Sequence, residues 1–319
     1  MTGRQLVSVV IPARNEAPHI AGVVASVLAE REDGIDVEVV LVDDGSTDDT
    51  AERATSAGAR VVPVVDPARA GKPGASRNLG AELTSGDPLI FLDADCTVAP
   101  GWLRAILDAH GAGAAVVGGA LELPPGLSAT ARCDYYCGWY VVHPRRPAGW
   151  VPHHPPPNLS VRRGSFLATR GFSEDPPLAY ANEERAWLAD VRRAGGRIYF
   201  EPRAVVYHAN RPGIANLLRR NYRWGYTAIQ SKSQTRAARI AWLYKSPSLM
   251  IAASFPLAFA HTAYIVGCWL RAGIFEPVLM LPLVLVSRFA YAAGMTVGGV
   301  RWLRSRLGST PSDAWRPEW

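Results

Sequence analysis

The chain of 319 residues contains few cysteines, and their spacing does not suit a metal centre or a disulfide framework. The four are Cys96, Cys133, Cys137 and Cys268, and only the second and third lie close together. A structural zinc site usually takes four ligands in two closely spaced pairs, and no second pair is present. We therefore expect free thiols in a reducing compartment.

The N-terminus lacks the features of a secretory signal. Residues 1–6 lead directly into the apolar run 7–11, which is too short for the hydrophobic region of a signal peptide. We expect the first strand to begin there and the N-terminal part to stay in the cytosol.

The chain also lacks an obvious surface for nucleic acid, although its formal net charge is +6. Nucleic-acid-binding surfaces combine clustered basic residues with aromatic ones. Here the basic residues cluster beside the apolar stretches of the last third. We expect no nucleic-acid partner.

The first 125 residues alternate between two kinds of segment. Apolar runs typical of strands occupy 7–11, 37–42, 60–65, 89–92 and 115–121. Segments with helical spacing occupy 17–30, 48–57, 74–84 and 101–109. Apolar strands that alternate with helices predict a parallel sheet with helices on both faces. In such a sheet, ligands bind beyond the carboxyl ends of the strands.

The middle of the chain, from about 126 to 212, is less regular and is rich in Pro, Gly, aromatic and His residues. A helix with alternating charge is predicted at about 182–194. Two short strands are predicted at 197–200 and 204–207.

The last third contains two long apolar stretches. Residues 246–270 include no Asp, Glu, Lys or Arg, and residues 277–300 include only Arg288. About 20 apolar residues span a bilayer core, so the two stretches predict a transmembrane hairpin. The alternative is a buried helix pair of a soluble domain. His261, Pro282 and Arg288 favour that alternative, because an arginine inside a membrane is costly.

The charges that flank the hairpin predict its orientation. Basic residues precede the first stretch and follow the second, while Arg271 is the only basic residue of the turn. The basic residues before the first stretch are Lys232, Arg236, Arg239 and Lys245, and those after the second are Arg301, Arg304 and Arg306. The positive-inside rule places both flanks in the cytosol. We therefore predict a cytoplasmic-membrane protein whose catalytic part faces the cytosol. Its predicted segments are a catalytic domain over 1–225, a basic juxtamembrane segment over 226–245, two transmembrane helices within 246–300 and a cytosolic basic tail over 301–319.

Polar residues gather where the predicted strands end. The clusters are Pro12–Glu16, Asp43–Asp48, Gly71–Lys72 with Arg77, and Asp93 with Asp95. Each alone can be a turn or a helix cap. Two nearby carboxylates at the end of a buried strand repel each other unless a cation lies between them. A divalent ion such as Mg²⁺ or Mn²⁺, with diphosphate oxygens in its shell, is the usual solution.

In this order and at these spacings, the clusters resemble those of the family 2 glycosyltransferases over about residues 6–225. The resemblance implies a GT-A fold, an α/β architecture with a mostly parallel sheet flanked by helices, and a UDP- or GDP-sugar donor. It also implies nucleotide contacts for the first three clusters, with Pro12, Asn15 and Glu16 flanking the base and Asp43 and Asp44 at base or ribose. Lys72 and Arg77 would lie near the nucleotide pocket or the diphosphate. Asp93 and Asp95 match the metal-binding acid pair, with Asp95 as the more direct ligand.

Later motifs extend the resemblance. Asn158–Arg163 and Gly171–Glu174 look like the acceptor side of the family's site. The family usually has Glu-Asp where this chain has Glu183-Glu184, and the resemblance implies that Glu184, or Glu183 beside it, is the general base. Two acids in the first turn of a helix are also explained by the helix dipole alone.

Two further motifs have alternative interpretations. His208 resembles a histidine that lies near the metal and diphosphate in related enzymes, although a lone His at a strand end is often structural. The segment that carries Arg220, Arg223 and Trp224 resembles a motif of membrane-associated members that contacts the diphosphate and the sugar. A basic helix held against anionic lipid explains the same pattern.

The resemblance implies metal-assisted transfer of a sugar, with inversion, and the predicted membrane anchor suggests a lipid-linked or other membrane-delivered acceptor. A polyprenyl-phosphate glycosyl synthase is one version of this activity. A nucleotidyltransferase would normally carry a glycine-rich loop after the first strand, and residues 13–16 contain no glycine. A non-catalytic membrane-associated protein that binds nucleotide sugars is the remaining alternative.

Overall fold

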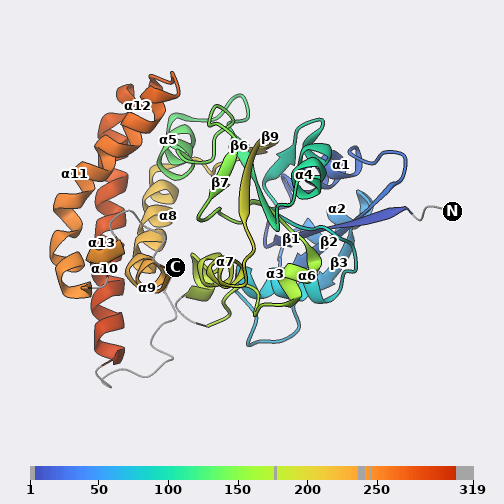
Figure 1. The fold of residues 1–319 in the computed structure, drawn as a ribbon. Coiled ribbons are helices and arrows are strands. Elements are labelled where there is room, and N and C mark those ends of the chain that lie inside the picture. Colours follow the sequence, from blue (N-terminus) through green and yellow to red (C-terminus); the bar gives the residue numbers. More distant parts are fainter. Residues whose placement is uncertain (1–3, 176–177, 236–240, 245, 307–319) are drawn as a thin grey trace. The chain divides into compact units, whose positions relative to one another are not determined.

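The computed structural model describes residues 4–175, 178–235, 241–244 and 246–306, and they form two compact units (Figure 1). The first unit comprises the described residues within 1–124, 142–174 and 187–209. The second comprises those within 125–141, 175–186 and 210–319. The division differs from the boundary expected at 225, because two inserted segments and residues 210–225 group with the C-terminal helices.

The first unit contains a nine-stranded sheet. The strands are β1 (Gln5–Ala13), β2 (Ile35–Asp43), β3 (Arg60–Pro63), β4 (Leu89–Leu92), β5 (Cys96–Val98), β6 (Val116–Glu122), β7 (Gly149–Val151), β8 (Asn158–Val161) and β9 (Ile198–His208). Their order is β3-β2-β1-β4-β8-β6-β9-β5, and β7 pairs with β9. The β3-β2-β1-β4 half is parallel, as the alternating pattern predicts.

Helices cover both faces of this sheet. In Figure 1, α1 (Ile20–Leu28), α2 (Thr50–Ser56) and α4 (Trp102–Gly111) lie on one side, and α3 (Pro73–Glu82) and α6 (Arg163–Leu167) lie on the other. Helix α7 (Glu184–Arg193) follows the short 3₁₀ turn Leu178–Tyr180. Successive residues of β1, such as Val9 and Val10, are fully buried. Because both faces of the sheet are covered, the strands appear in the sequence as continuous apolar runs and not as an alternation of apolar and polar residues.

The other half of the sheet departs from the predicted parallel arrangement. β8 inserts between β4 and β6 and is antiparallel to both. β9 is a single strand where two were predicted, and its pairing with β6 shifts register between Gly119 and Ala120. The residues of β9 that fall in this irregularity, around Pro202, separate the two apolar halves that look like independent strands in the sequence.

The described part of the second unit is helical. Its helices are α5 (Ala129–Gly138), α8 (Ile214–Tyr226), α9 (Ala228–Thr235), α10 (Ala241–Tyr244), α11 (Pro247–Arg271), α12 (Glu276–Leu279) and α13 (Leu281–Arg306). Helices α8 and α13 pack closely through glycines. A Cβ added to Gly294 or Gly298 would lie 2.1 or 1.9 Å from a backbone oxygen of α8. Only glycine permits this approach of the two backbones.

Helices α11 and α13 are long and apolar enough to cross a membrane, by length and composition. They overlap the two predicted spans, although α13 begins only after the separate helix α12 and continues to residue 306, into the predicted tail. Arg288, which counts against the second span in the sequence, is 2% exposed, and its guanidinium donates a hydrogen bond to the Asn221 side chain of α8. The arginine therefore faces other helices and not the outside of the unit, which is the usual position for a charge in a membrane segment. The flanking residues 236–240, 245 and 307–319 lie outside the described part, so the structure does not describe Arg236, Arg239 and Lys245.

Candidate functional site

The predicted nucleotide loops meet at one edge of the sheet. Strands β1 and β2 are parallel and end in register, with Ala13 opposite Asp43. The Asn15 side-chain oxygen accepts a hydrogen bond from the Thr47 backbone N–H at 2.8 Å, and the Glu16 N–H donates to Thr50 Oγ1 at 2.8 Å. Asn15 has a φ of +56°, a left-handed conformation that asparagine tolerates better than most residues. The two loops therefore form one rigid surface that follows directly from Pro12, near the end of β1.

The two acids at the end of β2 have different partners. Asp43 Oδ1 accepts a hydrogen bond from the Ser46 N–H at 3.1 Å and so shapes the turn. The Asp44 carboxylate accepts from the Gly71 N–H, at 2.8 and 2.9 Å from its two oxygens. Burial raises the pKa of Asp44, and the hydrogen bond from Gly71 opposes that rise. An ionised carboxylate has about four acceptor positions, so Asp44 keeps the capacity to accept from a ribose hydroxyl.

Arg77 contacts the predicted acid pair directly. Its Nη2 lies 2.6 Å from Asp93 Oδ1, and its guanidinium lies 5.5 Å from the centre of the Phe172 ring. Arg77 is 3% exposed. The sequence predicts a metal ion as the positive charge beside Asp93, and the structure adds the Arg77 guanidinium.

Replacing Arg77 with Met should lower the free energy of unfolding by about 2 kcal/mol, because a hydrogen bond to a charged group is worth roughly 1.5–3 kcal/mol. Asp93 remains partly exposed, with 26% of its side chain accessible, so its loss of a partner costs less than in a fully buried pair. Thermal unfolding should show a fall in Tm of about 4–8 °C.

The matched control for this prediction is Arg53→Met. Arg53 pairs with Asp49 at 3.6 Å, and both side chains are more than half exposed. Exposed pairs contribute between about 0 and 1 kcal/mol, so the control should unfold close to the wild-type temperature. Equal shifts in the two variants would contradict a special role for the Arg77–Asp93 pair.

Asp95 and His208 come together because β5 pairs antiparallel with β9. This register places Cys96 opposite His208, and the Ala209 N–H donates to the Asp95 carbonyl at 2.9 Å. His208 Nε2 lies 3.7 Å from Asp95 Oδ1. Ligand atoms of Asp95, Cys96 and His208 all lie within 4.8 Å of one another. The pairing thus joins two predicted metal ligands that are far apart in the sequence.

These residues fit a divalent cation. A carboxylate and an imidazole suit Mn²⁺, and oxygen ligands suit Mg²⁺, whereas the softer Cys96 thiol is a poor ligand for both. Cys96 was not among the predicted site residues. Its position directly after Asp95 is the only sequence signal for it, and the β5–β9 pairing that turns this position into part of a cluster has no signature in the local sequence.

Lys72, expected near the nucleotide pocket or the diphosphate, contacts the loop over 171–174. Its Nζ donates to the Glu174 carbonyl at 2.9 Å. The Asn78 side chain donates to the Phe172 carbonyl at 3.0 Å and to Glu174 Oε1 at 2.8 Å. The start of α3 therefore holds the 171–174 loop, which was predicted to lie on the acceptor side. The described contacts tie the Lys72 ammonium to this loop and not to Asp93 or Asp95.

The predicted base lies in the second unit, at the start of α7. Glu183 and Glu184 are 5% and 3% exposed. The preceding Asn182, at a φ of +63°, donates to Thr227 Oγ1 at 2.6 Å and accepts from Arg185 Nε at 2.8 Å. Burial lowers the pKa of Arg223, and the Glu183 carboxylate opposes that fall. The charge of Glu183 thus acts on Arg223. For Glu184, the distance from Oε1 to Arg185 Nε is 3.9 Å.

The basic motif of α8 forms a cluster with α5. Arg220 Nη1 donates to Asp134 Oδ2 at 2.5 Å, and the guanidinium lies 4.5 Å from the centre of the Trp224 ring and 5.0 Å from that of Trp139. Asn210 also donates to Asp134 Oδ2, at 2.6 Å. Asp134 and Trp139 were not predicted, because they lie in the irregular region where periodicity gives no signal.

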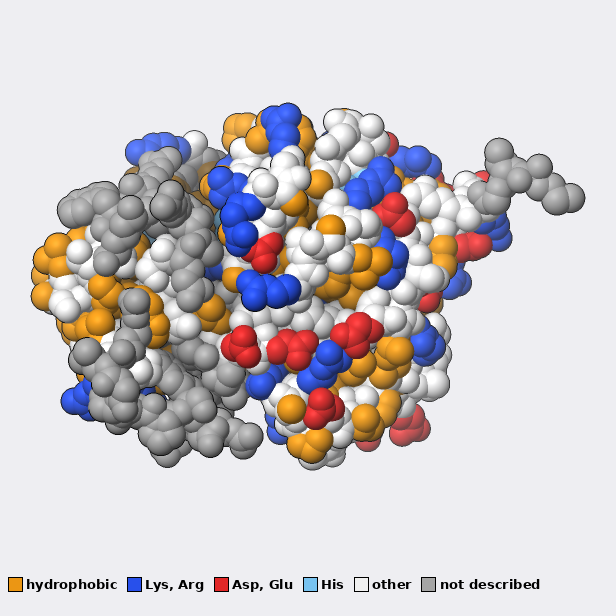
Figure 2. Space-filling view, turned by 60° about the horizontal axis from the view of Figure 1, so that its bottom comes forward, with side chains coloured by type: hydrophobic (Ala, Val, Ile, Leu, Met, Phe, Trp, Pro, Cys, Tyr) orange, Lys and Arg blue, Asp and Glu red, His pale blue; other side chains and the backbone are white. Residues whose placement is uncertain are grey.

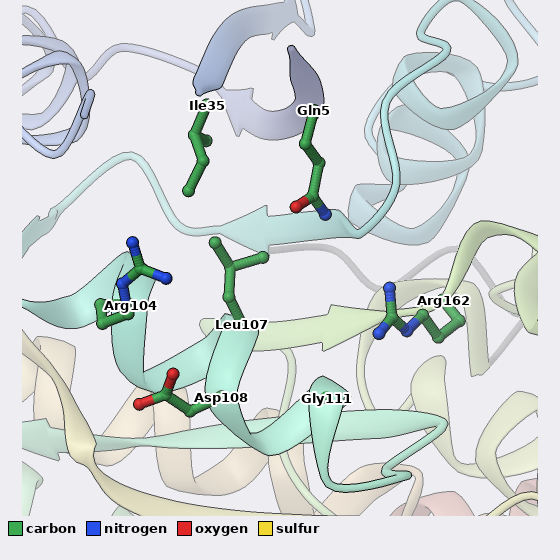
Figure 3. Close-up of a pocket in the computed structure, with 7 residues that line it drawn as sticks. All are labelled: Gln5, Ile35, Arg104, Leu107, Asp108, Gly111 and Arg162. Carbon is green, nitrogen blue, oxygen red and sulfur yellow. The ribbon is translucent and has the colours of Figure 1, made fainter. Parts of the chain in front are cut away.

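A shallow pocket of about 510 Å³ lies away from these groups (Figure 3). Gln5 and Ile35, which line it, are the first residues of β1 and β2, and Arg104 and Asp108 come from α4. The pocket is therefore at the amino ends of the strands. Ligands of such sheets bind at the carboxyl ends, so this pocket is not the candidate site.

The fold and the positions of the polar loops define a GT-A type protein. Residues 8–166 match the glycosyl transferase family 2 model. The glycosyltransferase AglE of Haloferax volcanii is 30% identical over 233 residues, which cover 70% of this chain and 73% of that protein. The chain therefore belongs to glycosyl transferase family 2 and is a glycosyltransferase.

Solved structures confirm the GT-A fold. The mannosyltransferase PcManGT of Pyrobaculum calidifontis, solved with GDP-Man and Mn²⁺, superposes with a TM-score of 0.59 at 20% identity, over 92% of this chain and 86% of that one. Glucosyl-3-phosphoglycerate synthase of Mycobacterium tuberculosis, solved with Mn²⁺, UDP and glucosyl-3-phosphoglycerate, gives a TM-score of 0.50 at 24% identity, over 73% and 81% of the two chains.

Proposed function

We propose that this enzyme transfers a sugar from a UDP- or GDP-sugar to an acceptor hydroxyl, with inversion and with the help of Mg²⁺ or Mn²⁺. The observation that carries the proposal is the approach of His208 to Asp95, 3.7 Å apart, in the GT-A sheet whose carboxyl edge also carries Asn15 and Asp44. Both solved relatives contain Mn²⁺ together with a nucleotide or nucleotide sugar.

The donor is assigned to the loops at the carboxyl edge. Pro12, Asn15 and Glu16 border the base, and Asp44, in the turn shaped by Asp43, accepts from base or ribose. Asp95 and His208 would hold the cation, and Asp93 is oriented by Arg77. When bound, the cation offsets the negative charge that develops on the departing nucleoside diphosphate. Lys72 acts indirectly in this scheme, by fixing the loop at Glu174.

The base is assigned to Glu184, which matches by sequence resemblance the position where the family usually has its general base. Its carboxylate takes the proton of the acceptor hydroxyl as the acceptor oxygen bonds to the anomeric carbon and the bond to the diphosphate breaks. Attack from the face opposite the leaving group inverts the configuration. Glu183 supports Arg223 by its charge, and Arg220, Arg223 and Trp224 are assigned to the diphosphate and the sugar.

The acceptor is assigned to the membrane, in a lipid-linked or otherwise membrane-delivered form such as a polyprenyl carrier. The support is the exposed surface of α11. Its buried side combines Ser254 and Thr262 with the apolar Met250, Ile265 and Trp269, whereas Phe255 and Phe259 are 47% and 58% exposed. Large apolar side chains on the outer side of a long helix are suited to contact with lipid. In Figure 2, hydrophobic side chains gather at the left, where α11 forms the surface. We assign the catalytic part to the cytosolic side of the cytoplasmic membrane.

A binding and transfer experiment tests the activity. The purified enzyme is titrated calorimetrically with UDP and GDP, each with and without Mn²⁺. The preferred nucleotide should bind tightly only with the metal. Its sugar conjugates are then incubated with membrane lipid extract or with 3-phosphoglycerate, the acceptor class of one relative. Transfer to lipid supports the proposal. Transfer to 3-phosphoglycerate alone contradicts the membrane acceptor, and binding of neither nucleotide contradicts a glycosyl donor.

Replacing Phe255 and Phe259 together with Glu should weaken binding to liposomes by at least about 10²-fold. Burying one Phe side chain contributes roughly 1.5–3 kcal/mol, and the two losses together exceed the ~2.8 kcal/mol that corresponds to this factor. Flotation of the full-length enzyme with liposomes measures the change. Leu167→Glu, at a 65% exposed position on α6 of the first unit, is the control and should float like the wild type. Equal flotation of the wild type, the double variant and the control would show that α11 does not form the membrane contact.

A further inference from the structure

We propose that the α11–α13 hairpin enters a single leaflet from the catalytic side, and that its turn stays on that side and does not reach the far face of the membrane. The proposal rests on the membrane association proposed above. It replaces the predicted crossing of the bilayer with an in-plane insertion, in which α11 contacts lipid with its outer side only.

The turn of the hairpin is fastened to α5. Glu276, the first residue of α12, accepts a hydrogen bond from Tyr136 Oη at 2.6 Å and forms an ion pair with Arg132. Trp269, in the last turn of α11, donates from Nε1 to the Tyr136 carbonyl at 2.9 Å and is fully buried. Its ring packs against those of Tyr135 and Tyr136, with centroids 5.3 and 5.1 Å apart. Several independent contacts therefore hold the turn against α5.

The chain around α5 is too short to cross a membrane. Val142 is six residues after Tyr136, and its carbonyl accepts from the Leu121 N–H of β6 at 2.8 Å. Six fully extended residues reach about 20 Å, whereas the hydrocarbon core of a bilayer is about 30 Å thick. A turn held by Tyr136 on the far side would therefore pull β6 of the catalytic sheet into the bilayer. The turn must lie on the side of the sheet.

The inner side of the hairpin is covered by protein along much of α13. Gly294 and Gly298 allow the backbones of α8 and α13 to touch, and Arg288 of α13 bonds to Asn221 of α8. Near the end of α13, Arg301 donates to Tyr226 Oη at 3.0 Å. Helix α8 itself carries Arg219, Arg220 and Arg223 and is unsuited to the bilayer core. A charged helix packed along α13 leaves the opposite side of the hairpin as its lipid contact.

That opposite side carries most of the exposed apolar side chains. Of the eighteen large hydrophobic side chains that are exposed in the described part of the chain, eleven lie between Leu249 and Val297. Phe255 and Phe259 meet the Phe289 ring, at centroid distances of 6.2 and 5.3 Å, in an aromatic group on this surface. The exposed side chains from Leu249 to Leu270 supply the area that an interfacial helix buries among acyl chains.

The exposed positive charges favour a lipid surface over a second copy of this chain as the partner that covers the apolar side of the hairpin. Arg271 is exposed at one end of the hairpin, and Arg301 and Arg304 are exposed at the other. In an in-plane hairpin all three lie at the same headgroup level, where each basic residue near an anionic surface contributes about 1 kcal/mol. In a spanning hairpin Arg271 would have to lie on the far side, which the positive-inside rule disfavours. The occupant is therefore one leaflet that contains anionic lipid.

The test locates the turn relative to the catalytic unit. Phe275, 71% exposed beside the turn, and Val65, 83% exposed in the first unit, are each replaced with Cys in a full-length Cys268→Ser background, where the remaining cysteines are buried. Each variant is labelled with a nitrobenzoxadiazole dye and reconstituted into sealed liposomes with anionic lipid. External dithionite, which does not cross the bilayer, reduces only dye on the outer side. The label at position 65 gives the fraction of molecules whose catalytic unit faces out.

The expected result is that dithionite reduces the same fraction of label at position 275 as at position 65. Fractions that add up to the whole, with position 275 protected wherever position 65 is reduced, would overturn the proposal and restore a spanning hairpin. Failure of the protein to float with the liposomes would also overturn it. Transferase activity is measured separately in detergent, so a failure of the proposed chemistry would appear there and would leave the location of the turn measurable.

Discussion

Asp95→Asn should lower the rate of sugar transfer by about 10³-fold. Metal stabilisation of a leaving group contributes several kcal/mol, and about 4 kcal/mol corresponds to this factor. The change removes one carboxylate charge and leaves the backbone contact from Ala209 to residue 95 intact. Mn²⁺ titration in the presence of the preferred nucleoside diphosphate should show weakened metal binding in parallel. Both readouts follow from the place of Asp95 beside His208.

The control for this prediction is Asp33→Asn, which removes a charge of the same sign from an exposed position before β2. It should transfer sugar and bind Mn²⁺ like the wild type. If Asp95→Asn keeps full activity with unchanged dependence on Mn²⁺, the metal assignment is wrong. If its metal binding is intact and only its rate falls, Asp95 acts on the donor directly and not through a cation.

The second large effect is expected at the start of α7. Glu184→Gln should lower kcat by about 10³-fold, because a positioned general base contributes roughly 10²–10⁴ to the rate and an amide cannot take the proton. Donor binding by calorimetry should be unchanged, since the base acts on the acceptor. Glu184→Asp should recover part of the activity, because it restores a carboxylate and the residue that the family usually has at this position.

Glu183→Gln separates the two acids. Its charge supports Arg223, so this variant should weaken donor binding more than it lowers kcat. Glu52→Gln, at an exposed position in α2, is the neutral control. A 10³-fold loss of kcat in Glu183→Gln with an active Glu184→Gln would transfer the role of base to Glu183. Full activity in both variants would show that neither acid is the base. The Tm of each variant shows whether loss of a buried carboxylate has disturbed the fold.

The parallel half of the sheet was predictable because its signal is local. Each strand of β3-β2-β1-β4 is a short apolar run followed by a helix, and a right-handed crossover leaves few ways to order such units. The polar residues that follow the strands then had to meet at one edge. For this reason the sequence predicts that Asn15, Asp44 and Asp93 lie at one edge of the sheet, and the β1–β2 register confirms that the loops after these two strands are neighbours.

The other half was not predictable, because its partners are distant in the sequence. Nothing in the residues of β8 indicates that they insert between β4 and β6, and the three-residue strand β5 is too short for any periodicity. The same limit applies to individual contacts. Arg77 was expected beside the diphosphate, and only the packing of α3 reveals that it pairs with Asp93. Likewise, the partner of Arg288 is on another helix. The sequence therefore shows that a charge in this apolar stretch is costly, but not which residue stabilises it.

The antiparallel pairing of β5 with β9 has a consequence for the order in which the enzyme becomes functional. Asp95 emerges from the ribosome 113 residues before His208, and the match to the family model ends at residue 166, before β9 begins. If Asp95 and His208 hold the metal as proposed, a nascent chain can carry every nucleotide loop and still lack one of the two ligands. Under that assignment the cation would bind at this site only after β9 has paired with β5. Metal affinity would then be acquired late in folding and would report on the presence of β9.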